Sequence, residues 1–170
     1  MTPSSPRARR RRGLADAESF PGMSDAVTGV AAIERLAAAF IACTLPKAEW
    51  THEAHLRVGL WHRLQMPAET ALEVLRDRIS RYNVSQGGVN TDTDGYHETI
   101  TRLYVILIDR FVRAADVART PDALADDLIL ELGHRDVPFR HYTRERLFSV
   151  AARRAWVAPD LEPLAPGPLA

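Results

Sequence analysis

The chain of 170 residues has little cysteine, no long apolar run and no net charge. Its single cysteine, Cys43, excludes an internal disulfide and with it the small disulfide-stapled secreted scaffolds. The most apolar run, residues 103–108, is interrupted by Asp109 and Arg110, whereas a membrane-spanning helix needs about 20 apolar residues. The N-terminal segment contains arginines but lacks the apolar core of a secretory signal. We therefore expect a cytoplasmic protein with no membrane segment.

The zero net charge conceals an asymmetry along the chain. Residues 1–22 hold five arginines and two acids, which leaves 17 basic and 20 acidic residues from Met23 onward. Because a like-charged segment stays extended, we predict that residues 1–22 are a disordered Arg-rich leader, 23–164 a single helical domain and 165–170 a flexible tail. A mildly acidic domain with mixed charges is not expected to bind nucleic acid.

Apolar residues recur at three- and four-residue intervals through most of the chain, which predicts helices. The predicted helices cover residues 25–43, the segment from Thr51 to Pro67, the segment from Pro67 to Gln86, residues 96–117, the segment from Thr120 to Gly133, and residues 144–154. Thr51 and Thr120 suit the N-caps of two of them. The predicted fold class is all-α, a compact bundle of five to six helices with disordered N-terminal and Pro-rich C-terminal tails. The helix of residues 96–117 has the widest apolar face, so we expect it at the centre.

Histidines gather at three of the expected helix starts. His52 and His55 lie three residues apart and so share one helix face, and His97 opens a later helix. If these helix starts meet at one end of the bundle, the three imidazoles can bind one divalent metal ion, such as zinc, iron or manganese, with an open position for substrate. Glu98 or His141 is then the catalytic acid or base, or a further ligand.

Three residues near these histidines are candidates for substrate contact: Tyr96, Thr101 and Tyr142. A site without metal fits the pattern nearly as well. Helix N-termini carry unsatisfied amides and attract carboxylate or phosphate groups, and Arg140 lies nearby in sequence. Histidine and glutamate can also act as acid and base without a metal.

Four functional hypotheses remain open at this level. The first is an enzyme that acts on a small molecule in a metal-containing pocket, and the second is a non-enzymatic module that binds a small anion. The third is a protein-interaction domain with structural histidines, and in the fourth each histidine caps or hydrogen-bonds locally without forming a site. His62, two turns after His55, is predicted to be a hydrogen-bonded interior side chain and not a ligand. The oligomeric state stays open.

Several motifs in combination resemble a family of small uncharacterised bacterial all-helical proteins. The residues that carry the resemblance are W-T-H-E-A-H-L at 50–56, R-Y-N at 81–83, N-T at 90–91, G-Y-H-E-T-I-T at 95–101, H-Y-T-R-E-R-L-F-S at 141–149 and P-D-L at 159–161. The likeness covers residues 30–164. It implies a bacterial cytoplasmic helical domain, names no reaction, and directs attention to the three histidine-bearing helix starts.

Overall fold

The computed structural model describes residues 31–116, 118–167 and 169, together with Met1. Within these residues the chain is helical and contains no strand, which confirms the all-α prediction. Apart from Met1, the predicted leader of residues 1–22 lies outside the described residues, as do the first residues predicted for the opening helix. No helix in the described ranges is both long enough and apolar enough to cross a membrane.

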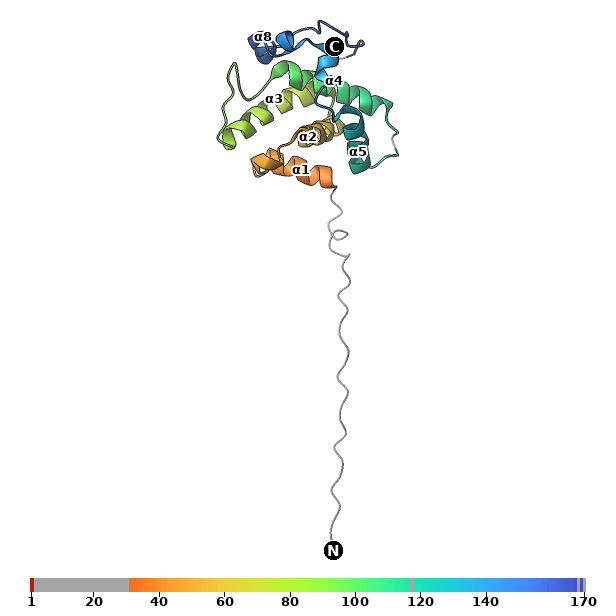
Figure 1. The fold of residues 1–170 in the computed structure, drawn as a ribbon. Coiled ribbons are helices and arrows are strands. Elements are labelled where there is room, and N and C mark those ends of the chain that lie inside the picture. Colours follow the sequence, from red (N-terminus) through yellow and green to blue (C-terminus); the bar gives the residue numbers. More distant parts are fainter. Residues whose placement is uncertain (2–30, 117, 168, 170) are drawn as a thin grey trace.

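Five longer helices form the body of the fold: α1 (Ala32–Ile41), α2 (His52–Gln65), α3 (Ala68–Ser85), α4 (Glu98–Ala114) and α5 (Pro121–Leu132). A single 3₁₀ turn, η1 (Lys47–Glu49), precedes α2. Three short helices follow α5: α6 (Pro138–His141), α7 (Arg144–Leu147) and α8 (Val150–Arg154). In Figure 1, α2 lies above α1 and below α3 and α4, and α8 lies farther up.

The helix with the most central position is α2, which contacts α1, α3, α4 and α5. The sequence favoured α4 for this place, but α4 packs against α2, α3 and α8 and so lies between the body and the C-terminal segment. One small residue contributes to the position of α2. At Gly59 an added Cβ would lie 2.8 Å from Cδ1 of Ile108, so the absence of a side chain lets α2 and α4 approach closely.

Threonine side chains begin two of the longer helices as predicted. Thr51 Oγ1 accepts a hydrogen bond from the backbone N–H of Ala54 at 3.2 Å. Thr120 Oγ1 accepts one from the N–H of Ala123 at 3.3 Å. Each bond satisfies an amide that the first helical turn leaves open, which confirms both predicted N-caps.

The N-terminus of α1 is capped by another helix. The Asp122 carboxylate of α5 accepts hydrogen bonds from the N–H groups of Ala32 and Ile33 at 2.9 and 2.8 Å. An aspartate in the first turn of α5 is expected from the sequence to favour its own helix N-terminus. In the fold it also joins α5 to α1 across 89 residues of chain.

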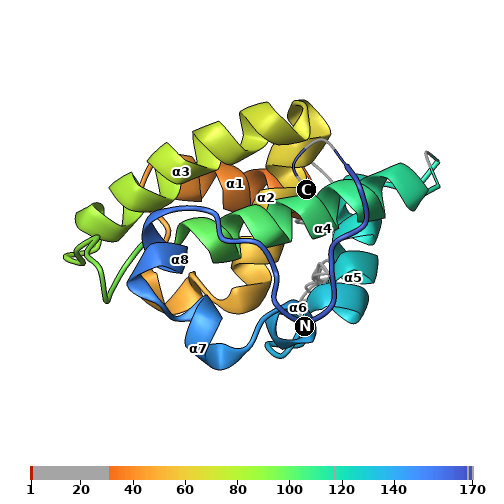
Figure 2. The same cartoon turned by 90° about the horizontal axis from the view of Figure 1, so that it is seen from above.

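The C-terminal quarter departs most from the prediction. One helix is predicted over residues 144–154, but α7 and α8 divide this segment because the Ser149 hydroxyl caps a new helix by accepting from Ala152 N–H at 3.1 Å. His141, expected at a helix start, is the last residue of α6. The chain after α8 runs back along α4 without forming a helix (Figure 2).

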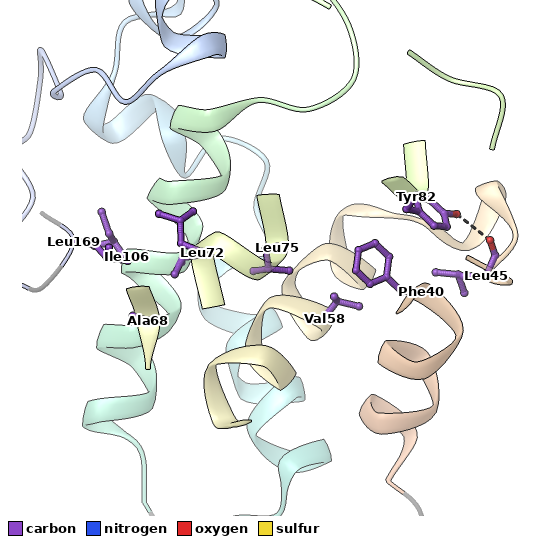
Figure 3. Packing of buried hydrophobic residues seen from close by; sticks show 10 residues of the cluster. Phe40, Leu45, Val58, Ala68, Leu72, Leu75, Tyr82, Ile106 and Leu169 are labelled. Carbon is purple, nitrogen blue, oxygen red and sulfur yellow. Dashed lines mark hydrogen bonds between the residues drawn. The ribbon is translucent and has the colours of Figure 1, made fainter. Parts of the chain in front are cut away.

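Three apolar clusters fill the interior. Figure 3 shows part of the first, in which Phe40 of α1, Val58 of α2 and Tyr82 of α3 converge. Tyr82 is 1% exposed, and its hydroxyl donates a hydrogen bond to the Leu45 carbonyl at 3.0 Å. Burial of apolar surface from four different helices supplies the main stabilising term of the fold.

His62 is the interior histidine that the sequence predicts. Its ring is fully buried, Nδ1 donates to the Val58 carbonyl at 2.7 Å, and Nε2 accepts from Arg78 at 2.7 Å. Burial lowers the pKa of His62 to about 4. The ring is therefore neutral at pH 7 with both nitrogens satisfied, which confirms that it is hydrogen-bonded within the protein.

Candidate functional site

A cavity of about 340 Å³ opens between α2, α3, α4 and the segment after α5. We call it the histidine cavity. Its polar groups come from Trp50, Thr51, His52, His55, Thr101, Tyr104 and Arg135. The rest of its wall is apolar and consists of Leu56, Val58, Gly59, Leu75, Ile79, Ile100, Val105 and Ile108. The members from α4 lie three and four residues apart, which places them on one face of that helix.

His52 is the first residue of α2, directly after the Thr51 cap. Its ring stands edge-on to the ring of Tyr104, with 5.4 Å between the centroids. Burial lowers the pKa of His52, although a hydrogen bond with the Leu132 backbone acts in the opposite direction. The Nε2 atom is buried and has no hydrogen-bond partner among the described residues. A buried nitrogen without a hydrogen-bond partner is unfavourable.

His55 lies almost one turn later on the same face of α2. Its Nδ1 donates to the Thr51 carbonyl at 2.6 Å, which leaves the lone pair on Nε2. The ring lies tilted against Trp50 with 3.8 Å between centroids, and Trp50 in turn stacks on Phe40 at 4.5 Å. The surrounding protein desolvates the ring and lowers the pKa of His55 to about 4, although part of its surface stays exposed because it lines the cavity. His55 is thus a neutral imidazole with a fixed orientation, and its Nε2 can accept a hydrogen bond.

Arg135 brings a positive charge to the same cavity from the segment after α5. Its side chain is exposed, and no described acidic side chain forms an ion pair with it. After burial, this charge is a further reason why the pKa values of His52 and His55 are lowered. Burial raises the pKa of the neighbouring Tyr104 hydroxyl to about 12, so it is a hydrogen-bond donor at pH 7. The cavity can therefore pair with one negative group and exchange hydrogen bonds with neutral ones.

His97 is not among the residues that line the histidine cavity. It is the N-cap of α4, where Nδ1 accepts from the N–H of Ile100 at 3.3 Å. Its Nε2 donates to the Leu147 carbonyl at 3.0 Å. Both ring nitrogens are engaged within the protein, and the ring links α4 to the end of α7.

Glu98 and Tyr96 line a second cavity, on a different face of α4. Glu98 accepts two hydrogen bonds from Arg76, at 2.7 and 2.9 Å, and one from the Tyr96 hydroxyl at 2.8 Å. The hydrogen bonds from Arg76 hold the pKa of Glu98 below its ordinary value, so the carboxylate is ionised at pH 7. Of the three predicted substrate residues, Thr101 is the one that lines the histidine cavity.

His141 and Tyr142 hold the C-terminal segment against the body. His141 Nδ1 donates to the Glu162 carbonyl at 2.9 Å. Tyr142 is fully buried, and its hydroxyl donates to the Val157 carbonyl at 2.8 Å. Burial raises the pKa of Tyr142 above its ordinary value. Neither residue lines the histidine cavity or the second cavity.

The ligand set for a metal ion is incomplete in this arrangement. In the part of the chain that the structure describes, no group of three or more His, Cys, Asp or Glu side chains is placed to hold a metal ion. His52 and His55 each keep a free ring nitrogen on one face of α2, but His97 uses both of its nitrogens elsewhere. The predicted three-histidine centre thus lacks its third ligand here, and metal binding by the first two stays a prediction.

Tyr104 and Arg135, which line the cavity, are not among the predicted site residues. Tyr104 follows Thr101 by three residues, and that spacing on a helix could have identified it. Arg135 has no comparable signal, because it comes from the far end of α5 and reaches the cavity only through the packing of α5 on α2.

Comparison of the chain with protein-family models, curated proteins and solved structures finds no match in any of the three. Only the cavities themselves therefore indicate what the protein binds.

Proposed function

We propose that the protein binds a small organic anion with an apolar body in the histidine cavity. The observation that carries this proposal is the guanidinium of Arg135, which forms no ion pair with a described acid, beside two neutral imidazoles, His52 and His55, in a cavity whose remaining wall is largely apolar. A cation next to a low-dielectric wall attracts an anion more strongly than the same cation in bulk water. A carboxylate suits it best, since guanidinium donates two parallel hydrogen bonds to that group.

The size and wall of the cavity favour a small molecule. Its volume of about 340 Å³ falls at the lower end of the range of known ligand sites, about 300 to 1,000 Å³. Leu56, Val105 and Ile108 offer a wall against which an alkyl or aromatic body would lose its contact with water. The free Nε2 atoms of the two histidines suit a ligand that carries a hydroxyl or amine group besides its anionic group.

Catalysis on such a ligand would depend on His55. Its ring is held by the Thr51 carbonyl and by Trp50, and its Nε2 has no donor among the described residues, so it suits a general base. With a pKa of about 4 the ring is a weak base in the cavity by itself. A bound anion would raise that pKa by favouring the protonated ring, so proton transfer would be coupled to ligand binding.

A metal-dependent reaction is the second candidate, favoured by the buried and unpartnered Nε2 of His52 next to the free Nε2 of His55. A zinc, iron or manganese ion could take both imidazoles and leave its other positions to ligand and water. Elemental analysis of untagged protein, with and without reconstitution, decides this point. Near-stoichiometric metal in the wild type and its loss in the His52→Ala, His55→Ala variant would support it, and no metal after reconstitution would remove it.

The motif resemblance supports a bacterial cytoplasmic setting for this activity. The remaining rival is a protein-interaction domain whose histidines are structural. That alternative requires a stable complex on co-purification that survives substitution of His52 and His55, whereas the proposed function requires a small ligand whose binding depends on the cavity.

Binding tests the proposal directly. We would screen aliphatic, aromatic and hydroxy carboxylates for thermal stabilisation and measure affinities of the hits by calorimetry. Arg135→Gln removes the cavity cation, and Arg140→Gln is the matched control, because Arg140 is an exposed arginine nearby that does not line the cavity. We expect wild type and Arg140→Gln to bind alike and Arg135→Gln to bind at least about tenfold more weakly. Equal affinity in Arg135→Gln, or no saturable binding by any carboxylate, would overturn the proposal.

A further inference from the structure

The second cavity, of about 560 Å³, lies where α3, α4 and α8 meet the loop between α3 and α4. Figures 1 and 2 show α8 beside the start of α4 and next to this loop. We call it the arginine cavity. The charged residues that line it are Arg76, Arg102, Arg153, Arg154, Asp92 and Glu98. The proposed function makes no use of this cavity.

Each acid of the arginine cavity is already matched by one arginine. Glu98 is buried and accepts two hydrogen bonds from Arg76, at 2.7 and 2.9 Å. Asp92 accepts two from Arg154, at 2.6 and 2.5 Å. Because each pair is neutral as a unit, the two remaining arginines leave the lining with a net charge of +2.

Arg102 and Arg153 form no ion pair with any acid in the described ranges. Arg102 donates two hydrogen bonds to the Leu169 carbonyl, at 2.8 and 3.1 Å. Arg153 donates to the carbonyls of Gly95 and Tyr96, both at 3.1 Å. Both side chains are half-buried, so water solvates their charges only in part. Two partly buried cations whose hydrogen bonds in the described ranges go to neutral carbonyls create a site of positive potential.

We propose that the arginine cavity binds the phosphate group of a small phosphorylated molecule between Arg102 and Arg153. A phosphate dianion matches the net charge of +2, and guanidinium groups recognise phosphate oxygens through paired hydrogen bonds. The volume of about 560 Å³ leaves room for the rest of such a molecule. A longer polyanion fits less well, because the carboxylates of Asp92 and Glu98 in the same lining repel additional phosphates.

The proposal uses a different ligand group and different arginines from the proposed function, so each can fail alone. Inorganic phosphate and phenyl phosphate would be titrated into the full chain at constant ionic strength, with calorimetry and thermal denaturation as readouts. Wild type and Arg135→Gln should bind both probes saturably, and the Arg102→Gln, Arg153→Gln variant at least about tenfold more weakly. The double variant should keep wild-type affinity for any carboxylate that the histidine cavity binds.

Several results would overturn the proposal. They are no saturable phosphate binding by the wild type, unchanged affinity in the double variant, loss of binding in Arg135→Gln, and binding of a single-stranded oligonucleotide without binding of either phosphate probe. If the double variant loses its helical circular dichroism signal, Arg102→Gln alone takes its place. Among the described residues, the Arg102 side chain contacts the Leu169 carbonyl and the Trp156 ring, both near the end of the chain, so we expect the Arg102→Gln variant to fold. An unchanged phosphate affinity in this variant would then contradict the proposal.

Discussion

The histidine cavity and the arginine cavity lie on different faces of α4. They differ in how many of their polar groups have a partner within the protein. In the histidine cavity, Nε2 of His52 and the guanidinium of Arg135 have no partner among the described residues. In the arginine cavity, Glu98 and Asp92 each bind an arginine through two hydrogen bonds. A polar group that the protein satisfies contributes to stability, whereas one that it leaves open is available for binding.

The same contrast appears along α2. His62 has both nitrogens satisfied inside the core, whereas His55, two turns earlier, keeps one nitrogen free in the cavity. We therefore expect substitution of His62 or Glu98 to change the free energy of unfolding and substitution of Arg135 to change ligand affinity.

Acidification should have the largest effect on the free energy of unfolding. Burial lowers the pKa of His62 from 6.5 to about 4, so folding favours the neutral ring. The contribution of neutral His62 to the free energy of unfolding is complete above pH 6.5. It decreases by on the order of 3 kcal/mol as the pH falls toward 4. Hydrogen bonds from Arg76 hold the pKa of Glu98 below 4.5. The contribution of the ionised Glu98 carboxylate to the free energy of unfolding is therefore lost only at lower pH.

Urea denaturation at pH 7, 5.5 and 4 measures this loss. In His62→Gln the dependence of stability on pH over this window should be flatter, because one buried titrating ring is gone. A slope equal to that of the wild type would show that His62 is not the group responsible.

Glu98→Gln should have the next largest effect. The substitution keeps the shape of the side chain but removes the charge that Arg76 and Tyr96 hydrogen-bond, so we expect unfolding to become easier by about 2 kcal/mol. Chemical denaturation at pH 7 measures it. Asp77→Asn is the control, since Asp77 pairs with Arg81 at 3.7 Å on the exposed surface and should cost less than about 0.5 kcal/mol. Equal effects of the two substitutions would contradict the structural role of Glu98.

Thr51→Ala should have an intermediate effect. Thr51 lines the histidine cavity but is satisfied, because its hydroxyl caps α2, and loss of an N-cap costs about 1 kcal/mol. Thr120→Ala removes the corresponding cap of α5, away from the cavity, and should cost about the same. Thermal and urea denaturation of both variants check this. A cost at Thr51 far above that at Thr120 would mean that the hydroxyl does more than cap the helix.

Arg135→Gln should have the smallest effect on stability. The side chain is exposed and has no ion pair with a described acid, so we expect a change within about 0.5 kcal/mol. The same variant is expected to bind carboxylates more weakly. Arg135 is thus the residue whose substitution should change ligand affinity with little change in stability. A large loss of stability on denaturation would instead assign Arg135 a structural role.

Much of the local structure could be predicted from the sequence, because it depends on neighbours within one or two helical turns. Threonine before a predicted helix marked two N-caps correctly, and three-residue spacing placed His52 and His55 in one cavity. The helix ends were less exact. The helix expected from residue 96 begins at Glu98, because the ring of His97 serves as its cap.

The assembly of the site could not be predicted in the same way. His97 and Glu98 follow one another at a histidine-bearing helix start, and on that basis the sequence grouped them with His52 and His55. In the fold, the Leu147 carbonyl engages His97 and Arg76 engages Glu98, which directs both side chains to structural partners. Nothing in the local pattern distinguishes a histidine that caps a helix from one that lines a cavity.

The sequence by itself determined the all-α class, the caps of α2 and α5, and the pairing of His52 with His55. The class and the pairing follow from a helix repeat that brings residues three and four apart onto one face, and the caps follow from the unpaired amides of a first helical turn. Only the tertiary structure decided that α2 is central, that Arg135 reaches the histidine cavity, and that Glu98 belongs to another cavity. These outcomes depend on which helix faces pack together, and that choice is made by burial and close approach between segments distant in the chain.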